Sequence, residues 1–139
     1  MQGLEATLAE HPGDVRGGLL AFFKRLSERT EKKAFRGCAV SNSAVEFPDS
    51  GHPGRAAALA HKTRVRERFQ DLAREMGARK PGQLGDALFL LLEGAFLSGQ
   101  LFGGDGPAGV LRKAAAALID AHARPEAEPA VGSYIRKRD

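Results

Sequence analysis

The chain has 139 residues, of which 42% are hydrophobic and 27% are charged. This length suits one domain and allows a hydrophobic core to form without disulfides or metals. The net charge of +4 is too small to indicate nucleic-acid binding by itself. Cys38 is the single cysteine, so an intrachain disulfide is excluded and a reducing, cytoplasmic location is expected.

The sequence predicts neither a secretory signal nor a membrane partner. The N-terminal stretch MQGLEATLAE contains two acidic residues and lacks the apolar centre of a signal peptide. The longest nearly apolar stretch, Ala87 to Leu97, is interrupted by Glu93. It therefore falls short of the ~20 residues that a membrane-spanning helix needs.

The first half of the chain is expected to be helical. His11-Pro12-Gly13 ends a first helix over Met1 to Glu10, and Asp14 is placed to cap the second. The polar run from Ser27 to Lys33 is expected to be the frayed end of that second helix. Its apolar stripe has the 3.6-residue period of an amphipathic helix and consists of Val15, Leu19, Phe22, Phe23 and Leu26.

The middle of the chain is expected to contain a short helix with a weak apolar pattern, a loop and a long helix. Phe35 to Phe47 fits a short helix better than a strand, and Phe47 to Gly54 is a loop with two prolines and two glycines. Gly77 occupies a helix C-cap position, and Pro81 suits the first turn of the following helix. Between the loop and Gly77, a long helix over Arg55 to Met76 carries the stripe Leu59, Val65, Phe69, Leu72 and Met76.

The last two helices are expected over Gly82 to Phe102 and Ala108 to Ala123, so that residues 1–123 form the domain and 124–139 a loose tail. The Gly82–Phe102 helix is apolar nearly all round and must be covered nearly all round. It is either the central helix of a monomer of about six helices or part of a symmetric dimer, which we favour. One apolar stripe of this helix comprises Leu84, Leu88, Leu91, Leu92, Ala95, Gly99 and Phe102.

The order of these segments resembles the C-terminal region of tetracycline-repressor (TetR) family regulators. The similarity extends over roughly Leu4 to Ala121. The segments that carry it are Phe35-Arg36-Gly37-Cys38 through Ala44, Glu46-Phe47-Pro48-Asp49, His52-Pro53, Ala60-His61-Lys62 and Leu90-Leu91-Leu92-Glu93-Gly94-Ala95. The resemblance implies an all-helical homodimer with an apolar pocket for a small effector.

The resemblance also implies where two copies meet. In that family the last two long helices pack against their symmetry mates as a four-helix bundle. Small residues at this surface let helices approach closely. The predicted dimer-interface residues are Gly85, Phe89, Glu93, Gly94, Leu97, Leu111, Ala115 and Leu118.

TetR-type regulators begin with a three-helix DNA-binding domain, and nothing in this chain resembles its recognition helix. The expectation is therefore the effector-binding and dimerisation domain of a repressor, which would reach DNA only through a missing N-terminal helix-turn-helix domain. The alternative is a headless dimerisation module that regulates a full-length relative by forming heterodimers.

The effector pocket is expected to be mostly apolar with a few polar groups. For each apolar member the plain alternative is ordinary core packing. Cys38 can also pack as a small hydrophobe, Asn42 can cap the following turn with Glu46, and His61 can be a boundary histidine. The predicted pocket residues are Phe22, Phe23, Leu26, Cys38, Asn42, His61, Val65, Phe69, Leu88, Leu92 and Phe96.

No metal, cofactor or catalytic site is predicted. The histidines at 11, 52, 61 and 122 lack ligand spacing, and a Cys pair is impossible. The sequence contains no Gly-rich phosphate loop, no H-E-x-x-H and no nucleophile elbow. The chain is therefore not expected to be an enzyme.

Overall fold

The structure, a computed structural model, describes residues 1–47, 49 and 51–123. The predicted tail, 124–139, lies outside the described residues. Six α-helices and two short 3₁₀ helices form the described part, which contains no strand, so the all-helical prediction is confirmed. The helices are α1 (Gln2–Ala9), α2 (Val15–Thr30), α3 (Ala39–Glu46), α4 (Pro53–Glu75), α5 (Pro81–Phe102), η1 (Gly103–Asp105), η2 (Pro107–Val110) and α6 (Leu111–Ala121).

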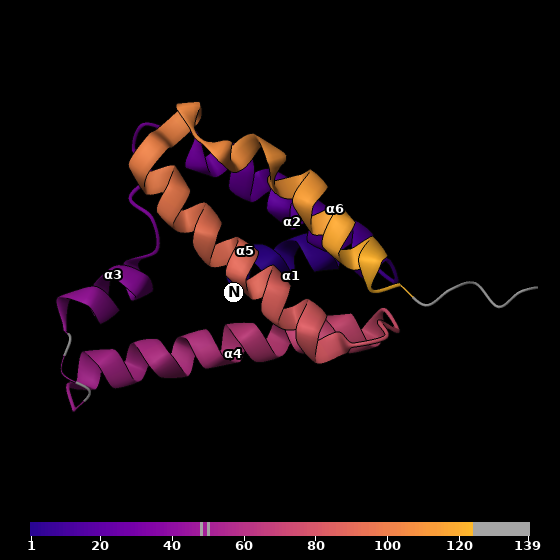
Figure 1. Cartoon of the computed structure of the whole chain (residues 1–139), viewed down its shortest axis with the longest axis horizontal. Helices are drawn as coiled ribbons and strands as arrows, with labels where there is room; N and C mark the ends of the chain where they lie inside the picture. Colours follow the sequence, from indigo (N-terminus) through magenta and orange to yellow (C-terminus); the bar gives the residue numbers. More distant parts are fainter. Residues whose placement is uncertain (48, 50, 124–139) are drawn as a thin grey trace, which may run out of the picture.

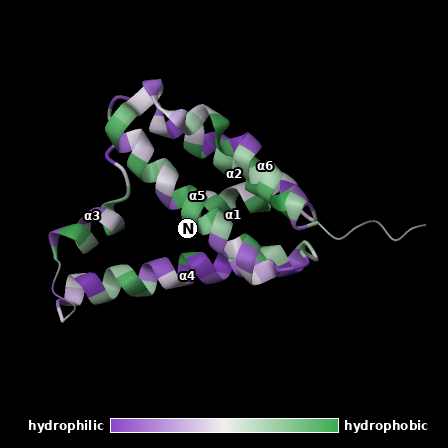
Figure 2. Cartoon of the chain, viewed as in Figure 1, coloured by the Kyte–Doolittle hydropathy of each residue, from purple (hydrophilic) through white to green (hydrophobic). Residues whose placement is uncertain are grey.

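The α5 helix lies at the centre of the arrangement (Figure 1). It packs along α4 on one side and against α2 and α6 on another, while α1 packs on α2. The α3 helix contacts α4 and covers its first half, away from the α2–α6 pair. Hydrophobic residues predominate along α5 and α6, whereas α4 carries many hydrophilic ones (Figure 2).

The predicted helix ends follow from local hydrogen bonding. The Asp14 carboxylate accepts a 2.8 Å hydrogen bond from the Gly17 N–H at the start of α2. After α4, Gly77 has φ +70°, a conformation that favours glycine, and its N–H donates to the Arg74 carbonyl. The α4 helix begins at Pro53, earlier than predicted, because His52 Nδ1 accepts the Gly54 N–H at 3.0 Å.

The predicted apolar stripes form the core, with two exceptions. Leu59 is 69% exposed because the first half of α4 extends past the bundle and packs only on α3. Phe102 is 59% exposed at the end of α5, where the chain turns at Gly103. The largest side chains of the core are Phe23, Phe69, Leu4, Leu19, Leu72, Leu84 and Leu88.

The end of α2 is not frayed up to Thr30, contrary to the prediction. Ser27 and Thr30 are both buried, and the Thr30 hydroxyl donates a 2.7 Å hydrogen bond to the Ser27 carbonyl. A Cβ added to Gly99 of α5 would lie only 2.5 Å from the Thr30 Cβ. Gly99 on α5 thus lets the end of α2 pack closely against it. The polar composition of that end of α2 gives no sign of this burial.

The apolar stretch in α5 is longer than predicted. By length and composition, Pro81–Asp105 passes the test for a helix able to cross a membrane. Its buried residues, among them Leu84, Leu88 and Leu92, pack against other helices of the chain. Its acidic side chains, Asp86 and Glu93, are paired with cations of α4. Only 22% of the most apolar window is buried within the described chain, so packing inside the bundle covers part of this apolar surface.

Asp86 links α5 to α4 and should give a pH-dependent stability. The side chains of Arg66 and Gln70 donate hydrogen bonds that lower the pKa of Asp86 to about 2. A carboxyl whose pKa is lowered in the folded state stabilises the protein above its unfolded pKa, and this contribution is lost as pH falls from about 4 to 2.

Asp86→Asn is therefore expected to lower the free energy of unfolding at pH 7 by under about 1 kcal/mol, since the pair is half exposed. Urea unfolding at pH 7 and at pH 3 measures the difference between the variant and the wild type. The difference should shrink at pH 3, and an equal difference at both values would contradict the assigned ion pair.

Candidate functional site

A cavity of about 200 Å³ lies between α1, α2, α4 and α5. Most of the predicted pocket residues line it. Its lining comprises Met1, Gly3, Leu4, Arg29 and Lys62 together with eight of the eleven predicted residues, namely Phe22, Leu26, Cys38, His61, Val65, Phe69, Leu92 and Phe96.

The other three predicted pocket residues lie elsewhere. Phe23 and Leu88 have no exposed surface and belong to the core, where Phe23 stacks on Phe69. Asn42 lies on α3 and donates its side-chain amide to the Arg36 carbonyl at 3.1 Å. Phe23 faces the core because it is rotated by one residue from Phe22, which lines the cavity.

The cavity walls come from single faces of three helices. On α2, Phe22 and Leu26 are four residues apart, and Arg29 follows three residues later on the same face. On α4, Lys62 likewise precedes Val65 by three residues. Arg29 and Lys62 were not predicted at the cavity, although helical spacing places both beside predicted pocket residues.

A polar cluster borders the cavity where α3, α4 and α5 meet. Lys62 Nζ lies 2.5 Å from Glu93 Oε1 and 3.4 Å from Cys38 Sγ. The Ser41 hydroxyl donates to Glu93 Oε2 at 3.1 Å. Glu93, predicted at the dimer interface, is a partner of Lys62 within the chain, and the side chains of Lys62 and Glu93 are 17% and 28% exposed. A carboxylate with this little exposure requires a cation, which α4 supplies.

The Lys62 ammonium contributes to lowering the pKa of two neighbouring side chains, Cys38 and His61. Burial raises the pKa of Cys38, but the N–H and hydroxyl of Ser41 and the Lys62 ammonium lower it below its ordinary value overall. The pKa of His61 is lowered, first by burial and then by positive charges that include Lys62 and Arg64. The surroundings thus make the Cys38 thiol more acidic and the His61 imidazole less basic than usual, since the pKa of each is lowered.

Lys62 also borders a second cavity, of about 340 Å³, beneath α3. Glu93 and Ser41 line this second cavity, so the polar cluster separates the two spaces. The α3 helix contains no buried residue. Its Ser41–Glu93 hydrogen bond is therefore a principal link between α3 and the centre of the fold.

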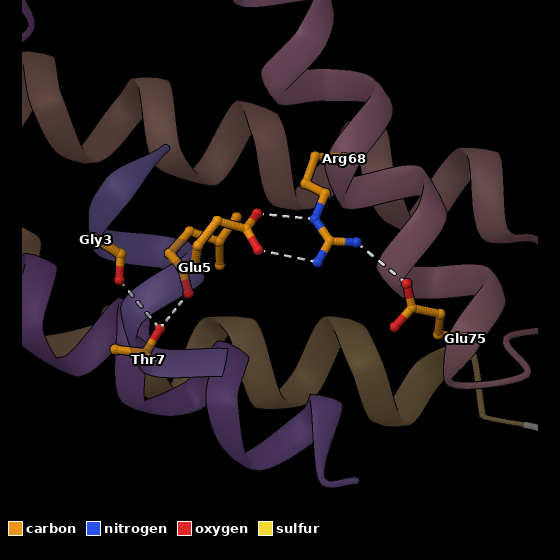
Figure 3. A network of polar contacts seen from close by, with 6 residues as sticks. Gly3, Glu5, Thr7, Arg68 and Glu75 are labelled. Carbon is orange, nitrogen blue, oxygen red and sulfur yellow. Dashed lines mark hydrogen bonds and ion pairs between the residues drawn. The ribbon is translucent and has the colours of Figure 1, made fainter. Parts of the chain in front are cut away.

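The α1 helix closes the opposite side of the first cavity, where Leu4 is buried. Arg68 of α4 holds α1 in place, donating to both carboxylate oxygens of Glu5 at 2.9 and 3.1 Å and to Glu75 at 3.1 Å (Figure 3). These contacts lower the pKa of Glu5 through the Arg68 hydrogen bonds. A bidentate pair of this kind fixes orientation as well as distance.

Several predicted dimer-interface residues are covered within the chain itself. Gly85, Leu111 and Ala115 are buried, and Gly85 lies against the backbone of Gln70 on α4. The proposed interface therefore does not include these three residues, because burial within the chain leaves them no surface for contact with a second copy. Phe89 and Leu118 are partly buried against the core.

The remaining two predicted interface residues, Gly94 and Leu97, are exposed on the outer face of α5. Leu90 and Leu101 continue the same face, since the four positions are spaced by four, three and four residues. Leu90, Leu97 and Leu101 are exposed by 60–69%. We call these four residues the α5 stripe. Exposed apolar residues of η2 and α6 are Val110, Ala117 and Ala121.

The described residues contain no group of three or more His, Cys, Asp or Glu side chains placed to hold a metal ion. The Cys38 cluster contains only two such residues, Cys38 and Glu93, and Lys62 occupies the space between them. The cluster is thus an ion pair with a neighbouring thiol.

A solved TetR-family transcriptional regulator from Streptomyces coelicolor superposes with a TM-score of 0.80 and 24% sequence identity. The match covers 88% of this chain and 65% of that regulator, which confirms the fold implied by the resemblance. No family model and no curated protein matches the chain.

Proposed function

We propose that this chain is the effector-binding and dimerisation domain of a TetR-type transcriptional repressor. The observation that carries the proposal is the cavity, whose walls contain two phenylalanine, leucine or valine side chains from each of α2, α4 and α5. Ligand sites are enclosed spaces of this character, mostly apolar with a few polar groups. The fold shared with the Streptomyces coelicolor regulator supports it.

The proposed ligand acts by changing how the helices pack. A molecule in the cavity touches α2, α4 and α5 at once, and α1 is tied to α4 through Arg68. A ligand that binds one arrangement of these helices better than another shifts the protein toward it. In a regulator of this type that carries helix-turn-helix domains, such a shift would alter the spacing of the two domains on DNA.

The proposed dimer uses the α5 stripe. Contiguous exposed apolar surface on a helix is typical of an interaction site. A two-fold axis near Gly94 would place α5 and α6 against their copies as a four-helix bundle. Both copies would then cover leucines that are otherwise more than half exposed.

Filling the cavity tests the proposal. Val65→Phe on α4 adds an aromatic ring to a cavity-lining residue that is 6% exposed. Phenylbutanol, an apolar uncharged probe, is expected to bind the wild type, and its affinity should fall at least about tenfold in the variant because the space is occupied. Isothermal titration calorimetry measures both affinities.

Val45→Phe is the matched control, because Val45 on α3 is 81% exposed and lies outside the cavity. This variant should bind phenylbutanol like the wild type. Equal binding of phenylbutanol by Val65→Phe and the wild type would overturn the assignment of the cavity as an effector site.

A further inference from the structure

One cation at the edge of the cavity has no acidic partner in the part of the chain that the structure describes. Five other arginines of the helices, at positions 16, 25, 66, 68 and 74, form ion pairs with carboxylates. Arg29 forms none with any described residue, although it lines the cavity. Its guanidinium lies instead over two aromatic rings, 5.6 Å from the centroid of Phe35 and 5.9 Å from that of Phe96.

The rings give Arg29 a defined position. Phe35 and Phe96 stack with a centroid distance of 6.2 Å and an angle of 10° between their planes. A guanidinium over such a ring face is held by cation–π attraction, and its N–H donors stay available in the plane of the group. Phe96 also lines the cavity, so the same ring contacts the guanidinium and the enclosed space.

Acidic groups at the cavity are fewer than basic ones. Arg29 and Lys62 line it, and no Asp or Glu is among its lining residues. Glu93 pairs with Lys62 from the neighbouring cavity, whereas Arg29 has no ion pair with a carboxylate among the described residues. The lowered pKa values of His61 and Cys38 agree with a positive potential in this region.

We propose that the cavity binds a small apolar carboxylate, with its hydrocarbon body between Phe22, Phe69 and Leu92 and its carboxylate on Arg29. Arginine and carboxylate form paired, charge-assisted hydrogen bonds, and the aromatic lining accepts an apolar body. The cavity volume of about 200 Å³ suits one ring with a short chain. This inference rests on the proposed function and names the chemical class of its effector.

Three probes with the same carbon skeleton separate charge from shape. Phenylbutyrate carries a negative charge, phenylbutanol none and phenylbutylamine a positive charge. With the full chain in isothermal titration calorimetry, the affinities should decrease in that order. Binding of phenylbutanol as tight as that of phenylbutyrate would overturn the inference while the proposed function stands. Binding of none of the three would overturn the proposed function, and the inference with it.

The variant Arg29→Gln tests whether the Arg29 side chain binds the carboxylate of phenylbutyrate. The variant should bind phenylbutyrate about tenfold more weakly, the size of effect expected for one charge-assisted contact, and phenylbutanol unchanged. Arg36→Gln is the matched control, since Arg36 is exposed nearby and bonds only to the Lys33 and Phe35 carbonyls. Equal weakening in both variants would show a general charge effect and overturn the Arg29 contact.

Glu93→Gln should act in the opposite direction. The substitution keeps the shape and can still accept the Ser41 hydroxyl, but it leaves the Lys62 charge without a partner. Phenylbutyrate should then bind more tightly than to the wild type, and phenylbutanol equally. Weaker phenylbutyrate binding, with unchanged circular dichroism, would contradict a cavity that selects anions by its positive potential.

Discussion

Replacing Gly94 with leucine is expected to convert the proposed dimer into a monomer. Gly94 is at the centre of the α5 stripe, and a Cβ added there meets nothing within 4 Å of its own chain. The substitution is therefore accommodated in the single chain, where leucine also favours a helix more than glycine does. In a dimer, the new side chain would force apart two helices that meet at the glycine.

Light scattering coupled to size-exclusion chromatography measures the change as a halving of the mass. Gly82→Leu is the control, because Gly82 is on the same helix, also meets nothing within 4 Å, and lies outside the α5 stripe. The control should remain dimeric. A monomeric wild type, or a dimer that persists in Gly94→Leu, would contradict the proposed interface.

Replacing Gly85 with alanine is expected to destabilise the fold, although it adds only one methyl group. The added Cβ would lie 2.6 Å from both the Cα and the N of Gln70. These are backbone atoms of α4, so they cannot move aside as a flexible side chain would. Overpacking of this kind costs about 3 kcal/mol, a large part of the ~5–15 kcal/mol that stabilises a typical domain.

Urea unfolding of Gly85→Ala measures this loss, read as a lower midpoint at an unchanged slope. Gly82→Ala places the same methyl group one turn earlier, in open space, and should have the wild-type stability within about 0.5 kcal/mol. A Gly85→Ala protein as stable as the wild type would show that α4 and α5 pack less closely than described.

Gly85 and Gly94 show what the sequence leaves open about the packing of α5. Both were assigned to the dimer interface, because a small residue in an apolar helix indicates close approach of another helix. Gly85 does mark such an approach, but to α4 of the same chain. Gly94 has open space beside it. The composition of α5 does not tell whether a given glycine faces α4 of the same chain or a helix of a second copy.

The cavity was predicted more completely than the interface. Eight of its lining residues were named from helical spacing and family resemblance, since each wall uses one face of one helix. Arg29 and Lys62 were missed for a shared reason, which is that long charged side chains can bury their stems beside apolar neighbours while their charged ends find partners. For Lys62 the partner is Glu93, and for Arg29 it is a pair of aromatic rings.

By itself, the sequence determined the helical class, the positions of the long helices, the Asp14 and Gly77 caps and the residues that share each helix face. These features depend on contacts between residues a few positions apart, which the chain order specifies directly. Only the tertiary structure decided which side of α5 faces α4 and which remains exposed, and that Glu93 pairs with Lys62. Hydrophobic attraction has no direction, so a helix that is apolar nearly all round does not specify its neighbours until shape and charge select them.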